Sequence, residues 1–260
     1  SNERPASTSL MTFKDHFSGH ATAYAAWRPT YPVALVDALA EQSPGTGTAW
    51  DVGCGSGQLS GLLTTRFRHV IATDASAEQV AHALAAPNVE YRCAPAETSG
   101  LAERSIDCIV VAQAAHWFDM HAFSTECTRV GRPGALVALV TYGWMFIRDD
   151  LDRCLNAFAL EQLSGFWPPE RHHVDTGYAE LHFPFEPVAF PAVSMRASWS
   201  LPQVLGYVGT WSAVAAARKA GAGGLFDTFA GELTSRWGAA ETVRAVEWPL
   251  TVRAGRVAAM

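Results

Sequence analysis

The chain contains few charged residues and no cluster of positive ones. Lys, Arg, Asp and Glu make up 17% of its 260 residues, and the formal net charge is -6. Proteins that bind a nucleic-acid backbone need gathered Lys and Arg side chains, because the release of counterions from phosphates drives much of that binding. The composition therefore argues against nucleic acid as a partner.

Long apolar runs and paired cysteines are also missing. A helix needs about 20 consecutive apolar residues to cross a membrane, and no run in this chain approaches that length, although 49% of the residues are hydrophobic. The five cysteines are odd in number and form no C-x-x-C pair, which is typical of reduced thiols in the cytoplasm. We expect a soluble, cytoplasmic protein with no membrane partner and no obligate protein partner.

The apolar segments that are present alternate between strand-like and helix-like patterns. Ile106–Ala112 is a short, almost continuously apolar run, a type of strand that belongs to parallel sheets covered by helices on both faces. The alternation predicts a doubly wound α/β fold, in which ligands bind beyond the carboxyl ends of the strands. The predicted strands are 49–53, 69–73, 89–93, 106–112, 135–141, 184–193 and 243–252, and the predicted helices are 32–41, 58–66, 75–85, 120–130, 149–163, 202–219 and 225–237.

Three glycines at alternate positions follow the first predicted strand. They stand in the stretch Asp51-Val52-Gly53-Cys54-Gly55-Ser56-Gly57, directly ahead of a predicted helix. Glycine lets the backbone approach a ligand closely or adopt a positive φ, and the N–H groups at the start of a helix can point at that ligand. A nucleotide-like cofactor is the expected occupant, and the alternative is a merely flexible turn.

The spacing of these glycines fits neither of two common phosphate-binding motifs. The dinucleotide fingerprint G-x-G-x-x-G would require glycine at Gln58 or Ser60, and no Gly-Lys-Ser/Thr of a P-loop follows. Asp74 ends the second predicted strand, where a carboxylate can accept both hydroxyl hydrogens of a ribose. Its alternative role is to cap the helix that begins near Ser76.

The motif D-x-G-x-G-x-G resembles the first motif of class I S-adenosylmethionine-dependent methyltransferases. The element Tyr24-x-x-x-Arg28-Pro29, the segment Gln113–Asp119 and the stretch "RVGRPGAL" are similar to small-molecule methyltransferases related to trans-aconitate methyltransferase. This resemblance covers Phe13–Val257. It implies a Rossmann-like sheet, mostly parallel with a late antiparallel strand, S-adenosylmethionine as cofactor, and a small-molecule acceptor for which a carboxylate is one option.

The resemblance also implies which residues meet the two ligands. Pro95 stands where such enzymes often have Asp, so the adenine contacts are expected from Glu97 and the backbone of Ala96. The expected cofactor-binding residues are Tyr24, Arg28, Asp51, Gly53, Gly55, Gly57, Asp74, Ala96, Glu97 and Gln113, and the expected acceptor-side residues are His116, Trp117, Trp144 and Trp167. Structural alternatives remain open: Trp117 as lid packing, His116 as a hydrogen-bonded core residue, and Arg28 as a surface charge.

We expect one domain with additions before and after a central core. Segments ahead of the first strand and after the fifth would lie above the carboxyl edge of the sheet as a helical lid, and Trp167–His173 is predicted as an extended loop stiffened by two prolines. The expected division is a disordered or expression-derived start (1–12) and a single domain (13–260) with N-terminal lid helices (13–45), a cofactor-binding core (46–145), an insertion with lid and late strand (146–240) and a final strand (241–260).

Methyl transfer from a sulfonium needs little acid-base chemistry, since aligning the acceptor with the methyl group supplies most of the acceleration. A carboxylate acceptor would need no base, whereas a hydroxyl, thiol or ammonium group would have to lose a proton. His116 is the predicted base, with His172 or His173 behind it, and the spacing of the histidines predicts no metal site. Two alternatives stay open: an NAD-dependent oxidoreductase, disfavoured by the glycine spacing, and a non-catalytic protein that senses the adenosyl cofactor.

Overall fold

The computed structural model describes residues 29–258, and a sheet of eight strands forms its centre. The strand order is β3-β2-β1-β4-β5-β8-β6, and β7 pairs with β8 outside this path. The strands are β1 (Thr48–Val52), β2 (His69–Asp74), β3 (Val89–Cys93), β4 (Ile106–Ala112), β5 (Gly131–Tyr142), β6 (Glu186–Val188), β7 (Ser194–Trp199) and β8 (Arg244–Arg256).

The first five strands form the parallel part of the sheet. β1 pairs in parallel with both β2 and β4. The chain first adds β2 and β3 on one side of β1, and then crosses over to add β4 and β5 on the other side. The carboxyl ends of β1 and β4 therefore flank the point where the strand order reverses, which is where ligands bind in open sheets of this kind. β8 runs antiparallel to β5, β6 and β7. The predicted doubly wound sheet, mostly parallel with a late antiparallel strand, is confirmed.

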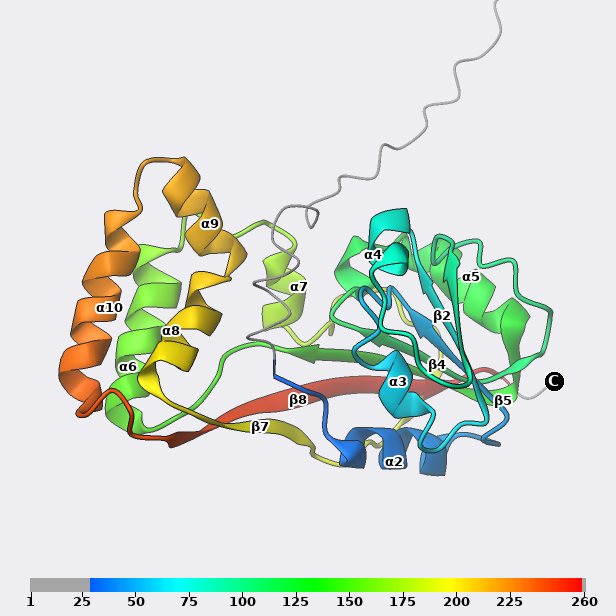
Figure 1. Cartoon of the computed structure of the whole chain (residues 1–260). Helices are drawn as coiled ribbons and strands as arrows, with labels where there is room; N and C mark the ends of the chain where they lie inside the picture. Colours follow the sequence, from blue (N-terminus) through cyan, green and yellow to red (C-terminus); the bar gives the residue numbers. More distant parts are fainter. Residues whose placement is uncertain (1–28, 259–260) are drawn as a thin grey trace, which may run out of the picture.

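Helices cover both faces of the sheet (Figure 1). One face packs on α2 (Val33–Gln42) and α3 (Ser60–Leu63), in a cluster that includes Val110, and the other packs on α5 (Met120–Val130), in a cluster that includes Val111. Successive residues of a strand point to opposite faces of the sheet, so Val110 and Val111 belong to different clusters. The short α4 (Ala77–Ala81) packs against β2 and β3.

The predicted helix 32–41 is present as α2, but it is not part of a lid above the sheet edge. Leu35, Val36 and Leu39 are fully buried in the same cluster as the sheet residue Ala138. A helix with an apolar stripe of this kind has to bury it, and α2 does so by lying flat on a face of the sheet. The remainder of the predicted N-terminal lid, 13–28, lies outside the described residues.

The long strand β8 connects the sheet to a helical unit (Figure 1). Its second half, from Leu250, pairs with β5, while its first half pairs with β7. Trp248 on the first half shares one apolar cluster with Phe158 and Phe229 of the helices. The helices of this unit are α6 (Asp149–Asn156), which continues as the π-helical segment η2 (Ala157–Gln162), α8 (Leu201–Gly209), α9 (Ser212–Lys219) and α10 (Gly224–Trp237).

The prediction of an extended loop over 167–173 is wrong at its end, because α7 (Arg171–Asp175) begins there. The carbonyls of Pro168 and Pro169 accept hydrogen bonds from the backbone N–H groups of Arg171 and His172. Proline lacks an N–H, and the first turn of a helix is the place where that loss costs nothing. The prolines therefore start this helix.

The second half of the chain differs from the prediction in two further places. The late strand predicted at 184–193 shrinks to β6, and β7 follows it where no strand is predicted. Met195 and Trp199 are the buried residues of β7, and this sparse pattern becomes a strand only because β8 offers a partner edge. The helix predicted at 202–219 is broken at Thr210 and Trp211 into α8 and α9.

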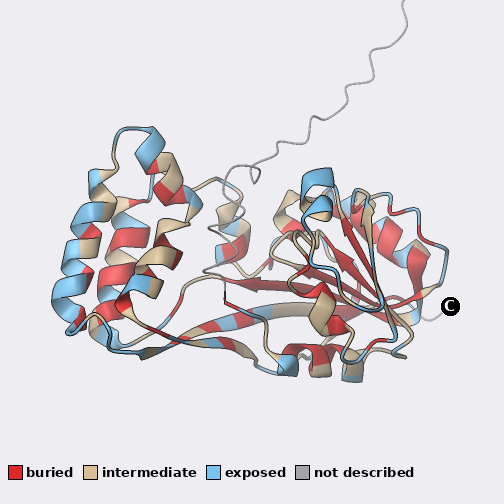
Figure 2. Cartoon of the chain, in the orientation of Figure 1, coloured by how far each residue is buried: buried red, intermediate tan, exposed pale blue. Residues whose placement is uncertain are grey.

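Burial follows this architecture. Figure 2 shows the buried residues concentrated in the sheet and on the inward sides of the helices. Within residues 29–258, no helix combines the length and the apolarity needed to span a bilayer.

Candidate functional site

The glycine turn after β1 has a backbone that only glycine adopts easily. Gly53, Gly55 and Gly57 have φ values of 67°, 54° and 83°. A Cβ at Gly53 would lie 2.6 Å from the Cβ of Ala114, and a Cβ at Gly57 would collide with the hydroxyl of Tyr91. All three glycines are therefore required by the shape of the turn, whereas a merely flexible connection would not need glycine at these positions.

Asp74, at the end of β2, supports this turn. One carboxylate oxygen accepts the backbone N–H of Gly55 at 2.9 Å, and the other accepts the N–H of Ser76 at 2.9 Å. Ser76 itself caps α4 by accepting the N–H of Gln79, so the capping role considered for Asp74 belongs to Ser76. Each carboxylate oxygen has a second lone pair, and Asp74 keeps the capacity to accept two ribose hydroxyls.

Asp51 lies beneath the turn and not on its surface. Its side chain is 1% exposed, and Oδ2 accepts a hydrogen bond from Oγ of Ser60 at 2.6 Å. Burial raises the pKa of Asp51 to about 7, the hydrogen bond from Ser60 opposes this shift, and the negative charge of Asp74 adds to it. Contact between Asp51 and a cofactor stays a prediction, while its support of the helix start at Ser60 is visible.

The residues after β3 lie beside the start of α5. Ala96 is buried, and Oε1 of Glu97 accepts the backbone N–H of Asp119 at 2.9 Å. Asp119 is the N-cap of α5 and accepts the N–H groups of His121 and Ala122. Glu97 thus ties the loop after β3, from which the adenine contacts are expected, to the loop after β4.

Gln113 follows β4 in a left-handed conformation, with a φ of 58°. Its side-chain Nε2 donates to the carbonyl of Tyr142 at 3.0 Å, and its Oε1 accepts from Oγ1 of Thr141 at 2.5 Å. These bonds fasten the end of β4 to the end of β5. A strained backbone held in this way is a common feature of functional sites, although the side-chain amide is already occupied by the protein.

His116 lies in the short 3-10 helix η1 (Ala115–Trp117) and contacts Tyr178. Its Nδ1 is 2.9 Å from the hydroxyl of Tyr178, and its ring packs against Trp117 with 4.8 Å between centroids. Burial lowers the pKa of His116 to about 4, assisted by the nearby His173 and Arg171 and opposed by Glu170. The imidazole is therefore neutral at pH 7.

The contact with Tyr178 is compatible with both neutral tautomers of His116. Nδ1 either accepts the hydroxyl hydrogen of Tyr178, which leaves the ring proton on Nε2, or donates to the hydroxyl oxygen, which leaves a lone pair on Nε2. A base that acts through Nε2 requires the second arrangement.

Two of the expected acceptor-side tryptophans lie together. The rings of Trp144 and Trp167 are 5.6 Å apart, and Trp211 lies 5.8 Å from the first and 5.6 Å from the second. The guanidinium of Arg171 lies over both Trp144, at 4.3 Å, and Trp167, at 4.7 Å. The structure thus adds a cation, Arg171, to the aromatic residues that are expected from the sequence on the acceptor side.

Tyr178, Trp211 and Arg171 contact the expected acceptor-side residues but are not predicted from the sequence. Arg171 stands in the stretch "WPPERHH". This stretch is rich in side chains that can bind a ligand, which is the one local feature that points to Arg171. Tyr178 carries no comparable signal, because its partner His116 is 62 positions away. The two predicted clamps, Tyr24 and Arg28, lie outside the described residues, and their roles stay predictions.

Among the residues that the structure describes, the other histidines do not assemble into a metal site. Nε2 of His172 is 2.8 Å from Oε2 of Glu180 at the surface, and His121 stacks on His182 with 3.8 Å between ring centroids. Over residues 29–258 no group of three or more His, Cys, Asp or Glu side chains is arranged to hold a metal ion.

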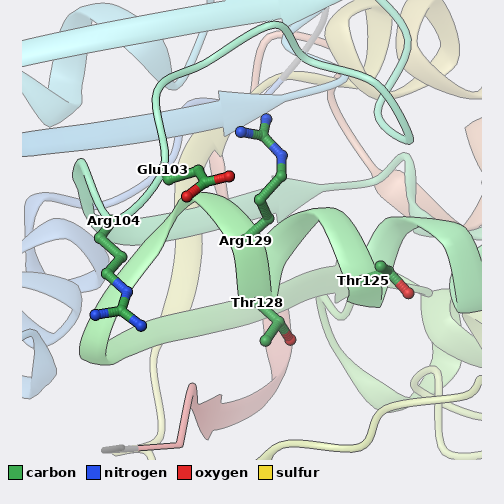
Figure 3. Close-up of a pocket in the computed structure, with 5 residues that line it drawn as sticks. All are labelled: Glu103, Arg104, Thr125, Thr128 and Arg129. Carbon is green, nitrogen blue, oxygen red and sulfur yellow. The ribbon is translucent and has the colours of Figure 1, made fainter.

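A hollow of about 450 Å³ lies at the opposite edge of the sheet (Figure 3). Glu103 and Arg104 line it from the loop ahead of β4, and Arg129 lines it from α5 with Thr125 and Thr128. Figure 3 shows these side chains around the last turns of α5. The guanidinium of Arg129 is already bound by Glu126 at 2.7 Å. Because β4 and β5 begin at this edge, the hollow is remote from the glycine turn and takes no part in the site.

Comparisons with known proteins indicate the family of the chain. Residues 50–139 match the family model of a methyltransferase domain. The chain is 34% identical over 215 residues to a protein of Dictyostelium discoideum described as a methyltransferase, covering 80% of this chain and 81% of that protein. It is also 34% identical over 125 residues to an uncharacterized methyltransferase of Mycobacterium tuberculosis, covering 48% of this chain and 51% of that protein.

The solved structures include one with a similar fold over almost its whole length. It is described as a type II methyltransferase from Anaeromyxobacter dehalogenans, with 42% identity, a TM-score of 0.86, and coverage of 90% of this chain and 99% of that one. The glycine turn, Asp74 and the strand order define a Rossmann-like enzyme of the methyltransferase type. The chain belongs to the class I S-adenosylmethionine-dependent methyltransferases.

Proposed function

We propose that the protein transfers a methyl group from S-adenosylmethionine to a small organic acceptor, with a carboxylate-bearing molecule as the preferred class. The observation that supports this most directly is the turn held by Asp74, whose glycines bare the backbone at the switch point of the sheet. The turn tolerates no side chain at Gly53 or Gly57, because a Cβ there would collide with Ala114 or with Tyr91. Family membership sets aside the oxidoreductase alternative.

The cofactor side is formed by the loops after β1, β2 and β3. The glycine turn would meet the amino-acid end of the cofactor, Asp74 would accept the ribose hydroxyls, and Ala96 with Glu97 would border the adenine. When bound, S-adenosylmethionine supplies an electrophilic methyl group whose bond to sulfur breaks, with its electron pair left on sulfur, as the acceptor forms the new bond to carbon.

The acceptor side is formed by η1, α7 and the loop after β5. α7 packs against η1, and the aromatic rings of Trp144 and Trp167 lie in the same region as Arg171. An aromatic wall suits a small acceptor, because it removes apolar surface and water from the reacting groups.

His116 is the proposed base for acceptors that must lose a proton. Its Nε2 would take the proton of a hydroxyl or thiol as the acceptor atom bonds to the methyl carbon, while Nδ1–H stays on Tyr178. A conjugate acid with a pKa of about 4 is deprotonated at neutral pH, so the base form is fully populated. It is also a weak base, which fits a reaction driven chiefly by the leaving sulfonium.

A calorimetric titration of the purified chain with S-adenosylmethionine and S-adenosylhomocysteine tests the cofactor part of the proposal. We expect binding that falls at least tenfold in Asp74→Asn and stays unchanged in the control Glu78→Gln, which makes the same change of charge in the first turn of α4. A folded protein that ignores both compounds at millimolar concentration would refute the proposal.

The transfer itself is tested with labelled S-adenosylmethionine and a panel of acids, phenols, amines and thiols. The expected result is label in the extractable product of at least one acid-bearing acceptor. Tight cofactor binding without transfer to any compound in a cell extract would instead support the non-catalytic sensor considered from the sequence.

A further inference from the structure

We propose that Arg171 is an anion-binding residue that anchors the carboxylate of the acceptor against the tryptophan wall. This rests on the proposed function for the identity of the ligand as acceptor, but the anion site itself stands on the geometry of Arg171. The acceptor class that follows is a small organic acid with a flat or hydrocarbon body.

The guanidinium of Arg171 lies in a corner formed by two aromatic rings. Trp144 lies at 4.3 Å and Trp167 at 4.7 Å from its central carbon, while the two ring centroids are 5.6 Å apart and the ring planes are inclined by 77°. The rings therefore lie on adjacent sides of the guanidinium and not on its two opposite faces. Its N–H groups lie in the plane of the fork, where they donate hydrogen bonds, and the rings exclude water from part of its surface, which strengthens any charge-assisted bond that it makes.

One edge of this guanidinium is in use and another is not. Nε donates to Oδ1 of Asp175 at 3.1 Å, an ion pair within α7. Nη2 is buried and has no hydrogen-bond partner among the described residues. A buried donor without a partner is destabilising, so an arginine held in this way gains by binding an acceptor oxygen.

The unpartnered nitrogen faces the carboxyl edge of the sheet. A Cβ built on Gly143, the residue after β5, would lie 4.0 Å from Nη2 of Arg171, and no other atom of the described residues beyond its two chain neighbours would lie within that distance of the Cβ. Gly143 therefore places no side chain on the approach to the guanidinium. β5 lies beyond β4 from the glycine turn, which puts Arg171 on the acceptor side of the switch point.

The same region contains the proposed base. Arg171 and His173 act electrostatically on His116, and α7 packs against η1. Nδ1 of His173 is a second buried atom without a partner among residues 29–258. A carboxylate bound to Arg171 would place the rest of a small molecule between the tryptophan rings and the imidazole of His116.

A carboxylate held by a guanidinium is a poor nucleophile, because its lone pairs are engaged in charge-assisted hydrogen bonds. The anchored group and the methylated atom are therefore different groups of the acceptor. A site with an anion anchor therefore still needs a base for that second group, the role proposed for the neutral His116.

The test measures the preference for an acid over its uncharged amide. Benzoate against benzamide and hexanoate against hexanamide are titrated by ligand-detected NMR into the full chain without cofactor. We expect the acids to bind the wild-type protein at least tenfold more tightly, Arg171→Met to reduce this ratio to about one, and Arg171→Lys to keep part of it. Arg196→Met removes an exposed arginine of β7 that pairs with Glu247 and is expected to leave the ratio unchanged.

Equal affinity of the wild-type protein for acids and amides, or an acid preference that survives in Arg171→Met, would overturn the proposal. Binding of S-adenosylmethionine by each variant is measured on the same samples and is expected to change less than twofold. A wild-type protein that does not bind S-adenosylmethionine would refute the proposed function instead. The acid preference could still be measured in that case, because its titration contains no cofactor. Arg171→Lys keeps the test valid if the methionine variant fails to fold.

Discussion

The hydroxyl of Tyr178 and Nδ1 of His116 lie 2.9 Å apart, and this pair determines what the histidine can do. Tyr178 is fully buried, and burial raises the pKa of its hydroxyl above the ordinary value. It therefore stays protonated and either donates to Nδ1 or accepts from Nδ1–H, and the proposed base role of His116 requires the second arrangement.

We expect Tyr178→Phe to lower kcat about tenfold for acceptors that must lose a proton, because the imidazole is no longer held in one tautomer and loses a hydrogen bond of about 1 kcal/mol. Cofactor affinity should stay constant. Steady-state kinetics and the nitrogen chemical shifts of His116 check this together. Wild-type kcat with an unchanged tautomer would contradict the role given to Tyr178.

The low pKa of His116 predicts an unusual pH profile. A histidine base ordinarily gives an acid limb near pH 6.5, but burial lowers the pKa of His116 to about 4. For hydroxyl or thiol acceptors, kcat/KM should stay level from pH 8 down to about 5 and fall below that. His116→Gln should remove most of this activity, and an acid limb that remained near 6.5 would assign the titration to another group.

His116 also affects stability, with a sign that follows from its depressed pKa. Its neutral form is favoured in the folded protein, so its contribution is complete above the unfolded pKa of about 6.5 and is lost as the pH falls through about 4. Urea unfolding of the wild type and of His116→Gln between pH 4 and 7 should show a smaller acid loss in the variant. Parallel curves would exclude this contribution.

Asp51 predicts the opposite trend. Its pKa is raised to about 7 by burial, so its contribution is present below the unfolded value of 3.8 and is lost as the pH rises through about 7. Asp51→Asn removes the titration, and its stability relative to the wild type should increase between pH 5 and 8 by an amount on the order of a few kcal/mol. Asp150→Asn, at an exposed ion pair, is the control, and an equal trend in both variants would contradict the assignment.

Gly57 and Gly134 form a matched pair for testing the glycine turn. Both have positive φ, 83° and 78°, but a Cβ at Gly57 would strike Tyr91, whereas a Cβ at Gly134 would meet nothing within 4 Å. Each Gly→Ala change should cost about 1–2 kcal/mol of backbone strain. Only Gly57→Ala should also lose cofactor affinity in a calorimetric titration, and equal affinities in the two variants would argue against a ligand at the turn.

Local chemistry explains why the glycine turn and the position of Asp74 at a strand end could be predicted from the sequence. The glycines of the turn and Asp74 follow continuous apolar strands, and each is required by backbone conformation or by its place at a strand end. The parallel core could be predicted for the same reason, since Ile106–Ala112 is almost entirely buried. Elements stabilised by distant partners, such as β7 on β8 and the break between α8 and α9, have weaker local patterns.

By itself, the sequence determined the doubly wound core, the glycine turn and the methyltransferase family, because strand periodicity and glycine conformation act over a few neighbouring residues. Only the tertiary structure decided that Tyr178 reaches His116, that Arg171 lies against Trp144 and Trp167, and that α2 covers a face of the sheet. These contacts join segments far apart in the chain. They depend on how the helical unit and the sheet edge bury their surfaces against each other, which no short stretch of sequence specifies.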